Sequence, residues 1–69
     1  MTQFTPTRAA FPRGVAAPAL RALASARLMT LSDLTTVSER ELLAMHGMGP
    51  KAVRILRDAM QLRGLRFKP

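Results

Sequence analysis

The sequence predicts an all-α fold, a compact bundle of four to five short helices. Leucine, alanine and methionine dominate the composition, and the only aromatic residues are three phenylalanines, which favours helices over strands. Apolar residues recur at three- and four-residue spacing. Serine, proline and glycine stand where those periodic segments begin and end. With 69 residues, the chain is long enough for one small domain with a modest core.

The first segment differs from the rest of the chain. Its helix-breaking residues are Pro6, Pro12 and Gly14. Because proline excludes a regular helix there, we expect residues 1–16 to form an extended, basic N-terminal arm and residues 17–69 to form the helical domain. Phe4 and Phe11 are candidates for packing on that domain. The two arginines of the arm either contact a phosphate backbone or stay solvated.

The first helix is expected from Pro18 to about Ala26, since proline suits the first helical position. Its apolar face contains Leu20, Leu23 and Ala24, at three- and four-residue spacing. Leu28 follows the helix and is expected to be buried.

Two capping patterns predict the next two helices. Thr30 and Asp33 resemble a capping box at the start of a short helix ending near Thr36. Ser38 and Glu41 repeat the device for a third helix that runs to about Met45. The residues expected to face inward are Leu31, Leu34, Val37, Leu42, Leu43 and Met45.

The fourth and longest helix is expected from Pro50 to about Arg63. Its apolar half comprises Ala52, Val53, Ile55, Leu56, Ala59, Met60 and Leu62. Gly64 is placed as a left-handed helix stop, after which Leu65 can fold back on the last turn. The spacing of Arg54 and Asp58 predicts a surface ion pair, and the tail brings Phe67 to the core.

The charge balance points to an acidic partner. The net charge is +7, from 11 basic and 4 acidic residues, so nucleic acid is the first candidate and an anionic membrane surface the second. The absence of cysteine excludes disulfides and thiolate metal sites. No apolar run reaches membrane-spanning length and the N-terminus lacks a signal-peptide pattern. We therefore expect a cytoplasmic protein, at the nucleoid if it binds DNA.

The turn between the third and fourth helices carries the most specific pattern, Gly47-Met48-Gly49-Pro50-Lys51. Glycine permits positive φ, so we expect both glycines to form a tight turn with Met48 tucked inward. The first amides of the following helix lack internal partners, and the helix dipole adds partial positive charge. With Lys51 beside them, these amides form a predicted phosphate site. The alternative is an ordinary helix–helix turn with an incidental lysine.

This pattern resembles the helix-hairpin-helix motif, whose members hold nucleic-acid backbone phosphates without reading bases. From about Ala17 to Phe67 the order of elements is also similar to the C-terminal domain of the bacterial RNA polymerase alpha subunit. The matching residues are Leu23, Leu28, Thr30 to Leu34, Glu41 to Leu43, Gly49, Lys51 and Arg63 to Leu65. The resemblance implies a compact, sterile-alpha-motif-like helical domain that binds DNA.

Carried over by position, the hairpin glycine and lysine of that family fall on Gly49 and Lys51. A polar DNA-contacting residue falls on Arg21. The arginine that enters the minor groove falls on Pro18, so sequence-specific recognition is not implied. Arg27 stands where such domains often place a glycine, and Val53 where the hairpin family often has alanine.

The sequence therefore predicts a small, non-enzymatic protein that grips double-stranded DNA through its phosphates, largely independently of sequence. The expected DNA-binding residues are Gly47, Met48, Gly49, Lys51, Ala52, Arg54 and Arg21. Two alternatives remain: a protein–protein interaction module of the transcription or repair machinery, for which the acidic segment 33–41 is the supporting feature, and an accessory to a separate catalytic chain. We expect a monomer without metal or cofactor. The single histidine, His46, is interpreted as a helix-end or solvated residue.

Overall fold

A computed structural model describes residues 11–69, and all structural statements below concern that range. The described residues form three α-helices, α2 (Ala17–Ser25), α3 (Glu39–Leu43) and α4 (Pro50–Leu62), and one short 3-10 helix, η1 (Ser32–Thr36), which lies between α2 and α3. The prediction of an all-α fold is confirmed. The structure has fewer α-helices than the four to five expected, because the segment after Leu31 forms a 3-10 turn. None of the described helices has the length and apolar character needed to cross a membrane.

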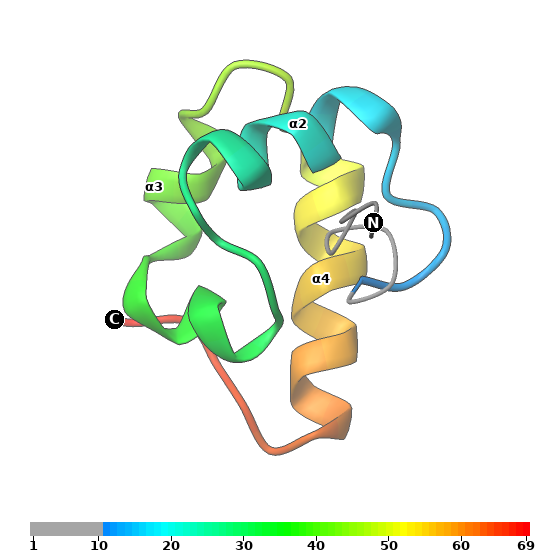
Figure 1. Ribbon diagram of the computed structural model, residues 1–69. Coiled ribbons are helices and arrows are strands. Elements are labelled where there is room, and N and C mark those ends of the chain that lie inside the picture. The colour runs from blue at the N-terminus through cyan, green and yellow to red at the C-terminus, as the bar shows by residue number, and fades with distance from the viewer. Residues whose placement is uncertain (1–10) are drawn as a thin grey trace, which may run out of the picture.

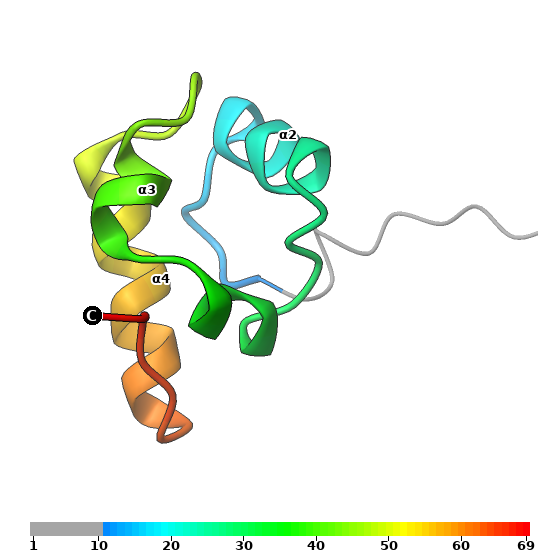
Figure 2. The same ribbon diagram turned by 90° about the vertical axis from the view of Figure 1, so that its left-hand side faces the viewer.

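The longest helix, α4, runs along one side of the molecule (Figure 1). Helix α3 packs beside it, and α2 lies on the other side of the core (Figure 2). Between them lies a core of leucines, methionines and small residues, among which Leu23, Leu34, Leu42, Leu56 and Met60 are the largest fully buried side chains. Phe11 and Val15 are also buried in this core, so the packed unit includes residues that precede α2. Phe4 lies outside the described residues.

Two helix N-termini carry the capping pairs that the sequence predicts. The Ser38 hydroxyl accepts a hydrogen bond from the Glu41 amide at 3.0 Å, and Glu41 accepts one from the Ser38 amide at 2.8 Å. Before η1, the Asp33 carboxylate accepts from the Thr30 amide at 3.1 Å, while Thr30 Oγ1 accepts from the Asp33 amide at 3.2 Å. Each pair satisfies backbone donors that the helix start leaves without partners.

Helices α2 and α4 end in the same way. After α4, the Gly64 amide bonds to the carbonyl of Gln61 and the Leu65 amide to that of Met60, with Gly64 at φ +73°. This is a Schellman motif, as the sequence predicts. After α2, the Arg27 amide bonds to the carbonyl of Ala24 and the Leu28 amide to that of Leu23. Here the left-handed position is occupied by Arg27, at φ +61°.

Near the C-terminal ends of all three α-helices, one residue expected on the apolar face is exposed. Leu62 is 89% exposed, because the C-terminal end of α4 projects beyond the other helices (Figures 1 and 2). Ala24 is exposed as well, and Ala19 takes its place in the core with Leu20 and Leu23. Leu43 is 43% exposed at the end of α3.

The C-terminal segment turns back after α4 and lies against the start of α3. The Lys68 amide donates to the Val37 carbonyl at 3.0 Å, and the Lys68 ammonium lies 3.5 Å from a Glu41 carboxylate oxygen. The hydrogen bond from the Ser38 amide, followed by the charge of Lys68, lowers the pKa of Glu41 below its ordinary value of 4.5. Phe67 packs partly buried against the core, as expected.

Candidate nucleic-acid interface at the turn between α3 and α4

The turn from α3 to α4 is held by hydrogen bonds between its own backbone groups. The Ala44 and Met45 amides bond to carbonyls of α3, and the Met48 amide donates to the Met45 carbonyl at 3.1 Å. The Met48 side chain is 8% exposed, so it tucks inward as predicted. Met48 therefore fixes the turn from inside, and its amide already has an acceptor.

The two glycines of the turn have different roles. Gly47 has φ +92°, and a Cβ atom placed on it would lie 2.7 Å from the carbonyl oxygen of Pro18 in α2. Gly49 has φ −121° in the extended region, and nothing lies within 4 Å of a Cβ placed there. Only Gly47 therefore needs the positive φ that the sequence assigned to both. Gly47 is required by the close approach of α2, whereas Gly49 leaves open space in front of α4.

That open space lies at the N-terminus of α4. Pro50 occupies the first helical position and Gly49 supplies no capping side chain. The amides of Gly49, Lys51 and Ala52 have no hydrogen-bond acceptor within residues 11–69. Since unpaired amides at a helix start attract anions, this end of α4 offers donors to a phosphate group. The Ala52 side chain is buried, so Ala52 can contribute only through its backbone.

Basic side chains stand beside these amides. Lys51 and Arg54 are exposed on successive turns of α4. The expected ion pair between Arg54 and Asp58 is absent from the described structure, whose two ion pairs join Arg57 to Glu39 and Lys68 to Glu41. An arginine four residues before an acid is the less favourable order on a helix. Both cations next to the turn are consequently available to an external anion.

Arg21 reaches the turn from α2. Together with Pro18, His46 and Gly47 it lines a hollow of about 450 Å³ between α2 and the turn. The structure thus brings Arg21 and Gly47 together, as the predicted interface requires. His46 is exposed at the same hollow, a placement that its position at a helix end did not reveal. Pro18 is the residue against which the turn packs.

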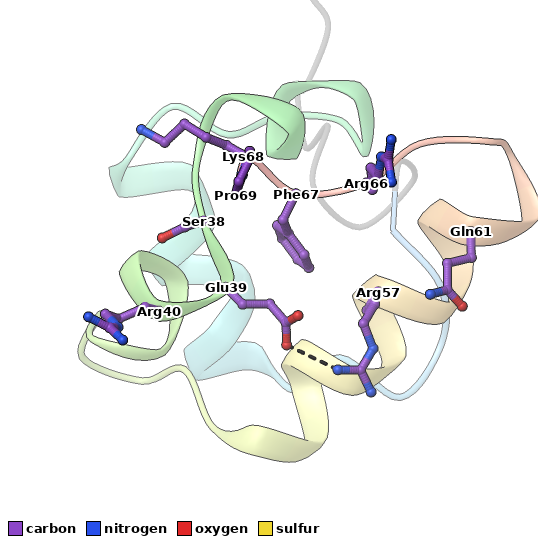
Figure 3. Close-up of a pocket in the computed structure, with 9 residues that line it drawn as sticks. All are labelled: Ser38, Glu39, Arg40, Arg57, Gln61, Arg66, Phe67, Lys68 and Pro69. Carbon is purple, nitrogen blue, oxygen red and sulfur yellow. Dashed lines mark hydrogen bonds and ion pairs between the residues drawn. The ribbon is translucent and has the colours of Figure 1, made fainter.

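A second hollow, of about 690 Å³, lies between α3, the C-terminal half of α4 and the C-terminal segment (Figure 3). Its lining includes Phe67, Gln61 and the ion pair that joins Arg57 Nη1 to Glu39 Oε2 at 3.0 Å. The sequence did not predict this pocket. The only available signal was a phenylalanine between two cations, Arg66 and Lys68, in a tail assigned to the core.

No group of three or more histidine, cysteine, aspartate or glutamate side chains within residues 11–69 is arranged to hold a metal ion. Comparison of the chain with protein-family models, with curated proteins and with solved structures finds no match.

Proposed function

We propose that this chain is a small DNA-binding module that holds duplex phosphates at the turn between α3 and α4, in the manner of a helix-hairpin-helix. The observation that carries the proposal is the open N-terminus of α4. There, the amides of Gly49, Lys51 and Ala52 are unpaired, and nothing lies within 4 Å of a Cβ atom placed on Gly49. A phosphate oxygen can approach such amides closely, and the helix dipole favours its charge.

The surrounding charge supports the same function. Lys51 and Arg54 extend the site along α4, and Arg21 extends it across the hollow to α2. These contacts reach phosphates and carry no base readout, so binding is expected to be largely independent of sequence and steeply dependent on salt. The net charge of +7 adds long-range attraction to a polyanion.

The acidic segment 33–41 gives less support to a protein-docking function. Asp33 caps its own turn, Glu39 is paired with Arg57, and Glu41 is paired with Lys68. Because each carboxylate already has an internal partner, this segment offers little free negative charge to a partner protein.

A nitrogen-15 NMR titration with a blunt DNA duplex tests the proposal. The expected result is that the largest amide shifts fall on Gly49, Lys51 and Ala52, with a second group near Arg21. Shifts confined to the opposite end of the molecule, around η1, would reject the turn as the binding site. Addition of salt is expected to reverse the shifts, since phosphate contacts release counterions.

A further inference from the structure

The pocket near the C-terminus shares no residue with the proposed phosphate site. It lies along the C-terminal half of α4, whereas the turn precedes the helix (Figure 1). Its volume, about 690 Å³, lies within the range of small-molecule sites. Four cationic side chains and one acidic side chain, that of Glu39, line it. Arg57 and Lys68 are paired with Glu39 and Glu41, whereas Arg40 and Arg66 have no ion pair within residues 11–69. The pocket therefore favours a ligand that carries negative charge.

An aromatic ring stands inside this pocket. Figure 3 shows the Phe67 ring directed from the C-terminal segment toward Glu39 and Arg57. The ring is partly buried against the core, and the next residue is tied to the start of α3 by the bond from the Lys68 amide to the Val37 carbonyl. The ring is thus held in position before any ligand arrives, which reduces the entropy lost on binding.

Planar polar groups line the same pocket as the ring. The ion pair between Arg57 and Glu39 fixes a guanidinium group and a carboxylate at one wall, at 3.0 Å from each other. Gln61 lies one turn further along α4 and offers both a donor and an acceptor, and Arg66, which precedes Phe67 in the C-terminal segment, also lines the pocket. Neither Arg66 nor Gln61 has a side-chain hydrogen bond or ion pair within residues 11–69.

We infer that this pocket binds an unpaired nucleobase of a single-stranded nucleic acid. The base stacks on Phe67, its edge meets Gln61, and Arg66 neutralises the attached phosphate. Stacking on a fixed aromatic ring beside cationic side chains is the usual physical basis of single-strand binding. An acidic peptide would use the charges and leave the ring without a role. The inference goes beyond the proposed function, which concerns duplex phosphates at the other end of α4, and it does not depend on that function.

The test compares three ligands of equal charge on the unmodified protein: a short single-stranded DNA oligonucleotide, its abasic analogue, and an oligo-aspartate peptide. Fluorescence anisotropy gives the affinities, and proton NMR follows the Phe67 ring and the Gln61 amide. The oligonucleotide is expected to bind about tenfold more tightly than the abasic analogue and to shift both sets of signals. Equal affinity for the abasic analogue or the aspartate peptide would overturn the inference, as would an oligonucleotide that leaves the ring signals unmoved.

Variants separate the two sites. Phe67→Leu keeps an apolar side chain against the core and removes the aromatic face, so single-strand affinity is expected to fall about tenfold while blunt-duplex affinity stays unchanged. Lys51→Gln is the converse control, expected to weaken duplex binding and to preserve the difference between the oligonucleotide and its abasic analogue. If Phe67→Leu retains full single-strand affinity, the inference fails and the proposed duplex function is unaffected.

Discussion

Gly47 lies against Pro18 so closely that a Cβ atom on the glycine would come within 2.7 Å of the proline carbonyl oxygen. This contact joins the turn before α4 to the first turn of α2. It also explains how Arg21, one turn further along α2, comes to share a hollow with the glycine turn. The position of α2 relative to the proposed phosphate site therefore depends on the absence of a side chain at residue 47.

The first prediction concerns this contact. Gly47→Ala forces alanine to φ +92° and into the Pro18 carbonyl, so the free energy of unfolding should fall by more than about 2 kcal/mol. Gly49→Ala is the matched control. It meets open space and should cost only about 0.5–1 kcal/mol through a poorer helix cap. Urea unfolding measures both, and equal losses would mean that the Pro18 contact does not hold the turn.

Replacement of Arg27 by glycine should raise the stability of the protein. Arg27 occupies a left-handed position, at φ +61°, in the same motif that Gly64 completes after α4. Arg27→Gly removes the steric cost of that conformation, partly offset by the greater freedom of the unfolded chain, and should stabilise the protein by about 0.5–1 kcal/mol. Gly64→Ala, the reverse change in the matching motif, should destabilise it by a similar amount. A lower melting temperature for Arg27→Gly would contradict this account.

Glu41 gives the protein a pH dependence. Its pKa is lowered in the folded state, first by the Ser38 amide and then by Lys68. A group with a depressed folded pKa contributes stability above its unfolded pKa, and the contribution is lost as the pH falls through the folded value. The melting temperature should therefore decrease as the pH drops below about 4.5. Glu41→Gln can still accept from the Ser38 amide but loses the negative charge that Lys68 stabilises. It should therefore be less stable than the parent near neutral pH and show a smaller decrease in acid.

Gly49→Asp tests whether stability and binding oppose each other at the start of α4. Aspartate is a better cap than glycine and complements the helix dipole, so the free energy of unfolding should rise by about 0.5 kcal/mol. The same carboxylate occupies the space proposed for phosphate, so duplex affinity should fall about tenfold at low salt. Ser32→Asp adds the same charge on η1, at the other end of the molecule (Figure 1), and should change the affinity far less. Equal losses in the two variants would indicate a general charge effect.

The sequence predicted the local features of the fold better than the contacts between its elements. The helix N-cap at Ser38 and the helix C-terminus at Gly64 could be predicted because each depends on residues only a few positions apart. The exposure of Leu62 could not be predicted, because a helical wheel shows which face of a helix is apolar but does not show where the neighbouring elements end. The same limit applies to the close approach of Pro18 to Gly47, which depends on how α2 crosses the turn.

In the candidate site, too, the sequence predicted the local features and did not predict the contacts between elements. Glycine, proline and lysine in the turn indicated a helix start with unpaired amides, and the structure has them. The different roles of Gly47 and Gly49 required their φ values and surroundings. The pocket around Phe67 brings together segments distant in sequence, α3 and the C-terminal residues. The cations on either side of Phe67 were a local signal, but they could not indicate that α3 lies beside them.

The salt dependence of duplex binding in Lys51→Gln and Arg63→Gln tests the central claim most directly. Both variants lose one exposed positive charge, Lys51 at the proposed phosphate site and Arg63 at the far end of α4. If Lys51 contacts a phosphate, its loss should reduce the slope of log affinity against log salt concentration by about 0.9, whereas Arg63→Gln should leave the slope unchanged. An unchanged slope in Lys51→Gln, or the same reduction in both variants, would contradict the proposal that DNA is held at the start of α4.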